Sequence, residues 1–278
     1  MQMGKLAYIF PGQGSQFPGM AADLYSSNPD LFESANRILG FRISDLMFNG
    51  SEEDLRRTDV TQPAVFLHSL AMASGMRKPD MVAGHSLGEF SALTVAGVLN
   101  FEDALKLVKA RAEAMQECCR KAEGTMAAII GPDAGTVEKA CEGSGVIAAN
   151  YNCPTQTVIS GAVSKVAELC DRFRESGAIV CPLNVGGAFH TPLMGAASGK
   201  LAEAIEATEF KAPICPVYQN VDASAETDPG RIKEKLLAQM TSPVRWSDTI
   251  LRMKADGAEE FVEVGPGKTL TKLNKRIL

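Results

Sequence analysis

Histidine is scarce in this sequence. Its 278 residues include only three, His68, His85 and His190. Imidazole is the side chain whose ordinary pKa lies nearest neutrality, so a reaction that needs such a group must use one of these three. The sequence also contains neither an H-E-x-x-H segment nor a C-x-x-C pair. These absences argue against the metal sites that such spacings build.

An excess of positive charge and long apolar runs are missing as well. Lys and Arg number 28 against 33 Asp and Glu, a net charge of −5, so no overall positive field attracts nucleic acid or anionic lipid. No stretch approaches the roughly 18 uninterrupted apolar residues of a membrane span. Residues 1–5 lead directly into a predicted strand, without the pattern of a signal peptide. The expected compartment is therefore the cytoplasm.

What is present is the composition of an ordinary globular protein, with 45% hydrophobic and 22% charged residues. The seven cysteines are odd in number and lie in apolar segments, which is typical of reduced thiols in the core of a cytosolic protein. The length predicts roughly two structural units.

The first part of the chain alternates short strands with helices. Residues 6–10 and 80–84 have the composition of buried strands, and a glycine-containing segment follows each. Helical composition follows over 89–99, and Asn100 stands at the N-cap position of a further helix over 101–120. This alternation predicts an α/β, hydrolase-like domain with a mostly parallel sheet.

The middle of the chain breaks that alternation. Its order of strand, helix, two strands, helix and strand is the βαββαβ pattern of a ferredoxin-like unit. The predicted strands are 125–130, 145–150, 156–160 and 178–183, and the helices are 133–142 and 162–175. We therefore expect a small subdomain over 124–188, inserted into a discontinuous large domain of residues 1–123 and 189–278. In the second part of that domain we expect helices at about 192–208 and 229–240, a helix ending near Lys254, and strands at 217–220 and 260–264.

Gly84-His85-Ser86-Leu87-Gly88 matches the pattern G-x-S-x-G between a predicted strand and a predicted helix. In that context the pattern forms a nucleophile elbow, a tight turn that presents the serine hydroxyl to a cleft. The backbone N–H of Leu87, at the start of the helix, is then placed to donate to an oxyanion. The alternative is a plain glycine turn with a solvated serine, because such pentapeptides also arise by chance. The flanking strand and helix favour the elbow.

A nucleophilic serine needs a neighbouring base. His68 lies in an apolar helical run, where we expect a core or boundary histidine with satisfied polar atoms. His85 precedes Ser86 inside the turn, so its ring should point away from the hydroxyl and pack. His190 lies in a glycine-containing loop where the chain returns from the insert, and loops on rigid scaffolds carry catalytic groups. By elimination we predict His190 as the base; no Asp or Glu that orients it can be identified, and a backbone carbonyl can do so instead.

Arg111 lies on an apolar helix face. On the helix predicted over 101–120 it shares that face with Ala104, Val108 and Met115. One interpretation is a buried structural ion pair or a side chain that reaches out to water. The other is a planar fork that binds a substrate carboxylate through two hydrogen bonds.

Gln13 lies in the glycine-rich loop that follows the first predicted strand. Hydrolase-like sheets take a second oxyanion donor from such a loop, so the Gln13 backbone N–H is a candidate. Phosphate-binding motifs are incomplete. Phe17 stands where G-x-G-x-x-G needs glycine, and Val262 stands where a P-loop ending in Gly267-Lys268-Thr269 needs it. No intact nucleotide-binding motif remains.

Motifs of one enzyme family follow one another along the whole chain. They are Phe10-Pro11-Gly12-Gln13-Gly14-Ser15-Gln16, Thr61-Gln62-Pro63-Ala64, Gly84-His85-Ser86-Leu87-Gly88-Glu89, Arg111, Gly187-Ala188-Phe189-His190, Pro243-Val244-Arg245-Trp246 and Val264-Gly265-Pro266-Gly267. In this order they resemble the malonyl-CoA:acyl carrier protein transacylases of type II fatty acid synthesis. Several motifs in one order are more specific than any one of them alone.

The resemblance implies an acyltransferase that passes a malonyl group through a serine ester in a ping-pong reaction. It also implies a backbone carbonyl near Arg245 that orients the base. The implied site residues are Ser86 as nucleophile, His190 as base, the N–H groups of Gln13 and Leu87 as oxyanion hole, Arg111 as the holder of the malonyl carboxylate, and Gln62 as a lining residue.

The implied substrates are malonyl-CoA and phosphopantetheinylated acyl carrier protein, with no bound cofactor, and we expect a monomer. Carrier proteins are acidic, which makes the basic residues Lys268, Lys272, Lys275 and Arg276 candidates for docking, although such a cluster is more often a solvated face. Three alternatives stay open. They are a serine esterase or thioesterase, a trans-acting acyltransferase of polyketide synthesis, and a catalytically silent module that binds carrier protein.

Overall fold

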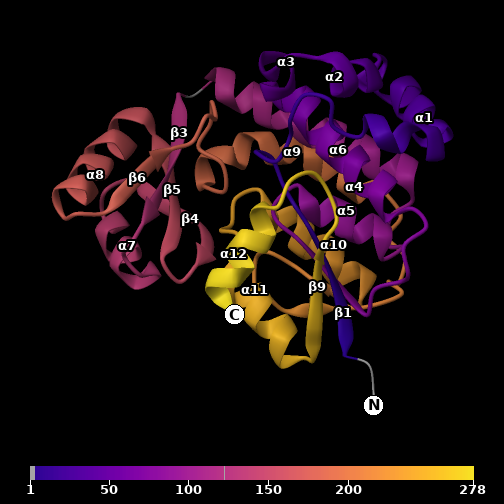
Figure 1. Ribbon diagram of the computed structural model, residues 1–278. Helices are drawn as coiled ribbons and strands as arrows, with labels where there is room; N and C mark the ends of the chain where they lie inside the picture. The colour runs from indigo at the N-terminus through magenta and orange to yellow at the C-terminus, as the bar shows by residue number, and fades with distance from the viewer. Residues whose placement is uncertain (1–3, 122) are drawn as a thin grey trace.

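The computed structural model describes residues 4–121 and 123–278 and contains two sheets, one in a large domain and one in a small subdomain beside it (Figure 1). Residues 1–3, with which the predicted large domain begins, and residue 122 lie outside the described part. An α/β domain with a mostly parallel sheet and a small antiparallel subdomain confirms the predicted fold class.

The sheet of the large domain has the strand order β8-β7-β2-β1-β9. Four neighbouring strands run parallel, and the short β8 pairs antiparallel with β7 at one edge. The strands are β1 (Lys5–Phe10), β2 (Met81–Gly84), β7 (Val217–Tyr218), β8 (Ala225–Glu226) and β9 (Ala258–Glu263). The carboxyl ends of the parallel strands therefore meet at one edge, where open α/β sheets place their sites.

Helices cover both faces of this sheet because both sides of its strands are apolar. Successive side chains of a strand point to opposite faces, so Leu6, Tyr8 and Phe10 belong to one core cluster and Ala7 and Ile9 to another. The first cluster packs against α4 (Thr58–Ala73), α5 (Gly88–Val95) and α6 (Phe101–Lys121), and the second against α11 (Trp246–Ala255) and α12 (Thr269–Ile277). Asn100 caps α6 as predicted, since its side-chain oxygen accepts from the N–H of Asp103 at 2.9 Å.

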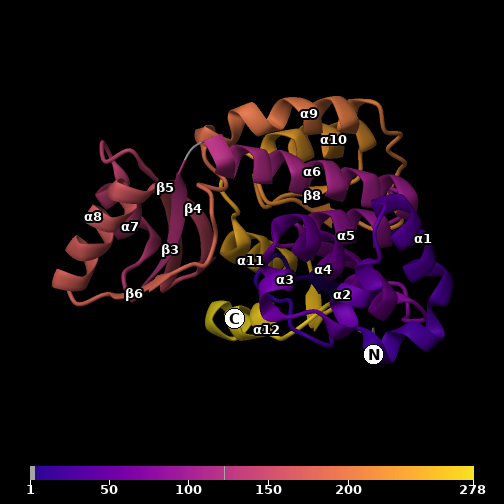
Figure 2. The same ribbon diagram turned by 90° about the horizontal axis from the view of Figure 1, so that it is seen from above.

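The remaining helices extend the first of these faces. Figure 2 shows α9 lying along α6, and α10 packs against α9. The elements are η1 (Ala22–Ser27), α1 (Pro29–Leu39), α2 (Ile43–Asn49), α3 (Glu52–Arg56), η2 (Pro192–Met194), α9 (Gly195–Glu206) and α10 (Pro229–Gln239). The helices before residue 57 and α12 were not predicted, and the single helix expected over 192–208 is a 3-10 turn followed by α9.

The small subdomain has the expected βαββαβ order. It consists of β3 (Gly124–Ile130), α7 (Ala134–Cys141), β4 (Val146–Cys153), β5 (Gln156–Ala162), α8 (Val163–Glu175) and β6 (Ile179–Pro182). The sheet order is β4-β5-β3-β6, antiparallel throughout, as in a ferredoxin-like unit. Figure 2 shows α7 and α8 on the outer face of this sheet, so its other face is turned toward the large domain.

One edge of the small sheet is joined to the large domain by backbone hydrogen bonds. The Tyr151 N–H donates to the Val244 carbonyl, and the Val244 N–H donates to the Ala149 carbonyl, both at 2.8 Å. Val244 thereby forms an isolated parallel bridge with Asn150, alongside β4. At the entry to the subdomain, Gly124 lies so close to the backbone of Ala188 that a Cβ would collide with it.

The seven cysteines are free thiols, but they are not all in the core. Burial raises the pKa of Cys141 and of Cys215 to about 11, so these thiols stay protonated. Cys181 is exposed and Cys119 is half-buried. The prediction of core thiols is wrong for Cys181 because β6 is an edge strand of the small sheet. Within the described residues, no helix is long and apolar enough to cross a membrane.

Candidate active site

Ser86 lies in a tight turn between the end of β2 and the start of α5. Its φ of 53° is a left-handed conformation that few residues other than glycine adopt. The glycines on either side have no room for a side chain, because a Cβ on Gly84 would collide with the backbone of Gly88, and a Cβ on Gly88 with that of Phe10. The G-x-S-x-G segment therefore forms the predicted elbow.

The loop after β1 lies against this elbow. The His85 N–H donates to the Phe10 carbonyl at 2.9 Å, and a Cβ on Gly12 would meet the His85 carbonyl oxygen. Gln13 follows Gly12 and lines a pocket of about 240 Å³ together with His85 and Asn152. The predicted candidate Gln13 is thus brought to the elbow from a distant part of the sequence.

His190 meets Ser86 from the loop that leads out of the small subdomain. Its Nε2 lies 2.8 Å from the Ser86 Oγ, and its φ is 58°, again left-handed. Its Nδ1 lies 3.1 Å from the Gln239 carbonyl oxygen and 3.2 Å from that of Ser242. A carbonyl oxygen only accepts hydrogen bonds, so Nδ1 carries the proton and Nε2 presents its lone pair to the serine.

The resemblance implied a carbonyl near Arg245, and the Ser242 carbonyl, three residues before Arg245, fits that expectation. The second carbonyl, of Gln239, lies six residues before Arg245. The Arg245 carbonyl itself accepts from the N–H and the Oγ1 of Thr249 inside α11. Burial, and then the positive charge of Arg111, lower the pKa of His190 to about 3. The imidazole is therefore neutral at pH 7, as a proton acceptor must be.

Arg111 enters the site from α6 and is 1% exposed. Its guanidinium donates to the Gln62 Oε1 and the Ser86 Oγ, both at 2.9 Å, and to the Gln239 Oε1 at 3.3 Å. Burial lowers its pKa to about 10, which leaves it charged at pH 7, and the Nε has no hydrogen-bond partner. Among the described residues its hydrogen-bond partners are neutral oxygens and not carboxylates, which fits a fork that receives the carboxylate of a ligand.

Gln62 lies on α4 and is fully buried. Its Oε1 accepts from Arg111 and its Nε2 donates to the Met115 Sδ at 3.1 Å. It lines the site by fixing one side of the guanidinium.

Three site residues were missed by the sequence reasoning. Gln239 donates from its Nε2 to the Ser86 carbonyl at 3.0 Å, Asn220 contacts the elbow, and the buried Glu89 contacts Asn220. A signal existed for Asn220, since it ends a strand that was predicted to lie in the parallel sheet, where the carboxyl end faces the site. Nothing in the local pattern marks Gln239, the last residue of α10.

The other two histidines do not face the serine hydroxyl. The His85 Nε2 lies 2.9 Å from the Asn152 Oδ1, and its ring packs on Trp246 with centroids 5.6 Å apart. Burial lowers the pKa of His85. His68 packs edge-on against Phe17, but its buried Nδ1 has no partner, so the expectation that its polar atoms are satisfied was wrong.

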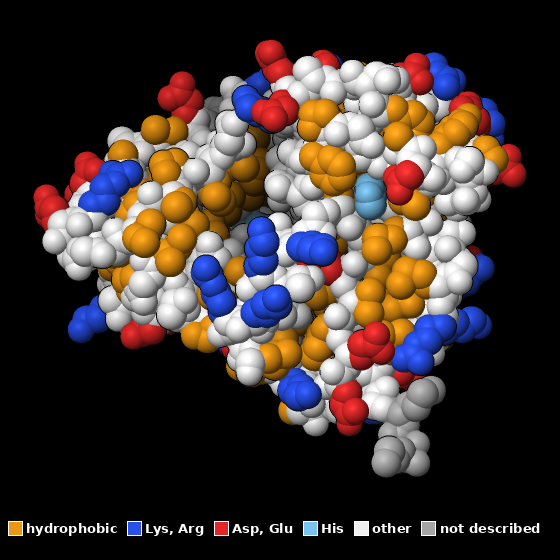
Figure 3. All heavy atoms as spheres, in the orientation of Figure 1, with side chains coloured by type: hydrophobic (Ala, Val, Ile, Leu, Met, Phe, Trp, Pro, Cys, Tyr) orange, Lys and Arg blue, Asp and Glu red, His pale blue; other side chains and the backbone are white. Residues whose placement is uncertain are grey.

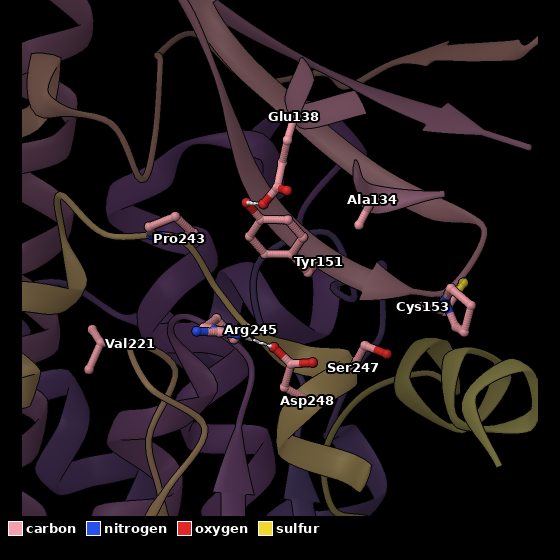
Figure 4. Close-up of a pocket in the computed structure, with 10 residues that line it drawn as sticks. Ala134, Glu138, Tyr151, Cys153, Val221, Pro243, Arg245, Ser247 and Asp248 are labelled. Atoms are coloured by element: carbon pink, nitrogen blue, oxygen red, sulfur yellow. Dashed lines mark hydrogen bonds and ion pairs between the residues drawn. The ribbon is translucent and has the colours of Figure 1, made fainter. Parts of the chain in front are cut away.

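Two hollows flank β4. Figure 3 shows one between the small subdomain and the large domain, with apolar side chains along its walls and Lys and Arg side chains gathered over α12 beside it. The second, of about 440 Å³, lies on the other side of β4 (Figure 4). Its charged groups are paired with one another or with Tyr151: the Tyr151 hydroxyl donates to Glu138 at 2.6 Å, and Arg245 pairs with Asp248 at 2.7 Å.

The arrangement can perform acyl transfer. A serine hydroxyl beside a neutral imidazole can attack a carbonyl carbon, and a buried cation next to it can hold an anionic group. Within the described residues no group of three or more His, Cys, Asp or Glu side chains could hold a metal ion.

A parallel α/β sheet with a serine elbow, a histidine at 2.8 Å and an inserted antiparallel subdomain is the architecture of a serine-dependent acyltransferase. The family model described as the acyl transferase domain matches residues 7–278. The chain belongs to the malonyl-CoA:acyl carrier protein transacylase family, which confirms the resemblance seen in its motifs.

Full-length relatives support this assignment. The chain is 43% identical over 288 residues to the malonyl CoA-acyl carrier protein transacylase of Bacillus subtilis, covering 99% of this chain and 91% of that protein. It is 42% identical to its Escherichia coli counterpart, with 99% and 94% covered. It is also similar to an acyl carrier protein S-malonyltransferase structure from Vibrio cholerae, with a TM-score of 0.93, 42% identity, and 99% and 94% of the two chains covered.

Proposed function

We propose that this protein transfers the malonyl group of malonyl-CoA to the phosphopantetheine thiol of acyl carrier protein, for fatty acid synthesis, through a malonyl ester on Ser86. The observation that carries this proposal is the Ser86 Oγ, which lies 2.8 Å from the His190 Nε2 and 2.9 Å from the Arg111 guanidinium. Nucleophile, base and cation thus converge on one atom, within reach of a substrate that has a thioester at one end and a carboxylate at the other.

In the first half-reaction the Ser86 Oγ attacks the thioester carbonyl carbon while the His190 Nε2 takes its proton. The carbon–sulfur bond then breaks, and the CoA sulfur leaves with the proton that His190 returns. The Gln239 and Ser242 carbonyls keep the other ring nitrogen protonated, so the imidazole offers one lone pair in a fixed direction.

In the second half-reaction the same groups transfer the malonyl group from Ser86 to the thiol of the carrier protein. His190 takes the proton of the carrier thiol, the sulfur attacks the malonyl ester, and the proton returns to the Ser86 Oγ as the carbon–oxygen bond breaks. Both tetrahedral intermediates carry an oxyanion. We assign its donors to the backbone N–H groups of Leu87, at the start of α5, and of Gln13, in the loop against the elbow. Loss of one such donor costs about 10²- to 10³-fold in turnover.

Arg111 selects the acyl group. Malonyl carries a carboxylate where acetyl carries hydrogen, and a buried guanidinium binds a carboxylate with two charge-assisted hydrogen bonds. Gln62 holds the fork on one side, so the carboxylate would be met in a fixed orientation.

Acyl carrier protein is the proposed acceptor and a docking partner. A type II polyketide acyl-carrier protein has been seen in complex with its malonyl-transacylase, and the chain is 39% identical to that structure with a TM-score of 0.93. Lys268, Lys272, Lys275 and Arg276 are exposed on and beside α12, the helix over which Figure 3 shows Lys and Arg side chains gathered beside the hollow. A local basic surface of this kind attracts an acidic partner although the whole chain is negative. The seven free thiols suit the cytoplasm as the compartment.

The test is covalent labelling. Incubation with malonyl-CoA should add the mass of one malonyl group to the wild-type chain and none to Ser86→Ala, and addition of carrier protein should remove the label from the enzyme and place it on the carrier. Release of free malonate at the same rate with and without carrier would instead indicate a thioesterase. Absence of any label on the wild-type chain would leave only a binding module.

A further inference from the structure

The side chain of Asn220 holds the elbow at two points. Asn220 follows β7, and its Nδ2 donates to the Gly84 carbonyl at 2.6 Å, while its Oδ1 accepts from the Ser86 N–H at 2.7 Å. One amide group thus bonds to the peptide groups on both sides of His85, at the sharpest part of the turn. The Asn220 side chain is buried, since the residue is only 1% exposed.

Asn220 is itself held in place. Its N–H donates to the Glu89 Oε2 at 2.9 Å, and its carbonyl accepts from the Arg245 N–H at 3.0 Å. The other Glu89 oxygen accepts from the Gln219 Nε2 at 3.0 Å. Glu89 is fully buried, lies three residues after Ser86 in the sequence, and makes no hydrogen bond to the serine hydroxyl. Its hydrogen bonds lead to the elbow through Asn220 and its neighbour Gln219, and also through Gln239, whose Nε2 donates to the Ser86 carbonyl.

The elbow needs such support because of its backbone conformation. A serine with φ of 53° is strained, and strain of this kind persists only where the surroundings fix it. Peptide groups in a turn also lack the regular partners of a strand or a helix, so a buried turn must find others. Asn220 fixes the strained turn and supplies hydrogen-bond partners to two of its peptide groups. By accepting the Ser86 N–H it also leaves the role of oxyanion donor to the neighbouring Leu87.

We propose that Asn220, supported by Glu89, is a positioning residue that fixes the direction of the Ser86 hydroxyl toward His190. This inference rests on the proposed function insofar as Ser86 is the nucleophile. It assigns no contact between Asn220 and the substrate. A misplacement of about 1 Å at a reacting group costs about 10²-fold in rate, so loss of the clamp should slow acylation and leave the binding of the malonyl carboxylate at Arg111 unchanged.

The first experiment compares Asn220→Ala with Asn36→Ala. Asn36 is a matched control, since it is also buried and holds a turn with both ends of its amide, at Ser44 on the far side of the large domain. We would measure the rate of malonyl-Ser86 formation at saturating malonyl-CoA, and the inhibition constant of free malonate as a probe of Arg111. Asn220→Ala should lose about 10- to 100-fold in rate with the malonate constant within twofold of wild type, and Asn36→Ala should change neither. An acylation rate of Asn220→Ala within twofold of wild type, or a parallel loss of malonate binding, would overturn the inference.

A second variant keeps the test decisive if Asn220→Ala does not fold. Asn220→Asp has the same shape, and only its protonated form has both a donor for Gly84 and an acceptor for Ser86. Burial, which also raises the pKa of the neighbouring Glu89, favours this protonated form, whereas the positive charge of Arg111, which acts on Glu89, opposes it. The acylation rate of Asn220→Asp should therefore rise as the pH falls from 8 to 6, where wild type stays flat. No such rise would refute the clamp.

The failure of this inference and that of the proposed function are distinguishable. An alkyl phosphonofluoridate reacts with an activated serine whatever its natural acyl group. If wild type reacts with it at Ser86 but takes no malonyl label, the proposed function is wrong, and the phosphonylation rates of the same variants still decide the role of Asn220.

Discussion

Replacement of Arg111 by alanine separates the malonyl group from the acetyl group. In the free protein the guanidinium donates to three neutral oxygens, those of Gln62, Ser86 and Gln239. A malonyl carboxylate must displace some of these bonds, so its net gain is smaller than that of two new charged hydrogen bonds. Taking hydrogen bonds to charged groups as about 1.5–3 kcal/mol each, we expect a net gain near the lower end, about 3 kcal/mol.

An acetyl thioester has no carboxylate. Its reaction in Arg111→Ala therefore loses only the interaction between Arg111 and Ser86. That is the one hydrogen bond from the charged guanidinium to the Ser86 Oγ, worth about 1.5 kcal/mol on the same scale, or about tenfold in kcat/KM. Both substrates share this loss in Arg111→Ala. The ratio of kcat/KM for malonyl-CoA to that for acetyl-CoA should therefore fall by the carboxylate contribution alone, about 100-fold at 1.4 kcal/mol per factor of ten.

The assay follows release of CoA with each substrate at a fixed concentration of carrier protein. Arg245→Ala is the control, because Arg245 is an exposed arginine paired with Asp248 and should leave the ratio within twofold of wild type. An equal loss for malonyl-CoA and acetyl-CoA in Arg111→Ala would refute the role of Arg111 as the carboxylate holder.

Four further predictions follow from the charges and the packing of the site and of α12. Because His190 has a pKa of about 3 in the folded state and 6.5 ordinarily, kcat/KM should stay flat down to about pH 5. The contribution of neutral His190 to the free energy of unfolding is complete above pH 6.5 and is lost as the pH falls toward 3, because only the unfolded chain then binds a proton there. In urea titrations the free energy of unfolding of wild type should therefore fall more steeply with acid than that of His190→Gln, by up to about 1.4 kcal/mol per pH unit. Reversal of Lys272 and Arg276 to Glu should raise the KM for carrier protein by about tenfold at low salt and less at high salt, with the KM for malonyl-CoA unchanged. Gly88→Ala should destabilise the fold by about 1–3 kcal/mol and slow acylation, because its Cβ would collide with the backbone of β1.

Each of these predictions would be contradicted by a specific result. An acid limb of kcat/KM near pH 6.5, or equal acid sensitivity of wild type and His190→Gln, would contradict a buried neutral imidazole. Reversal of Lys139 and Lys165, on the outer helices of the small subdomain, is the charge-matched control for the carrier surface, and an equal rise in KM there would indicate a nonspecific field. Wild-type stability of Gly88→Ala in urea would show that the elbow can shift away from β1.

The sequence predicted those parts of the site that carry a local constraint. Gly84 and Gly88 must be glycine because their neighbours leave no room for a Cβ, and this constraint is what the G-x-S-x-G pattern encodes. His190 was chosen because the alternatives were few, and the structure places its Nε2 2.8 Å from the Ser86 Oγ. The βαββαβ order likewise follows from strand and helix lengths that are readable within short windows.

Other parts of the site depend on contacts between distant residues. The carbonyls at His190 belong to the backbone, and no residue type marks them. Gln239 and Asn220 reach Ser86 from 153 and 134 positions away, and their roles exist only once α10 and β7 are in place. η1, α2 and α3 have only 6, 7 and 5 residues, too few for a clear periodicity. α1 (Pro29–Leu39) is different, because it buries Phe32, Ala35 and Leu39 at helical spacing and its pattern was readable.

The backbone bridge between β4 and Val244 links the width of the cleft to the readiness of the base. Ser242, two residues before Val244, carries one of the carbonyls that hold the His190 ring. A tilt of the small subdomain that keeps this bridge must pull the segment that carries the Ser242 carbonyl, and so move one of the two acceptors of the imidazole. The seating of the small subdomain and the orientation of the imidazole are therefore mechanically coupled through the backbone from Ser242 to Val244.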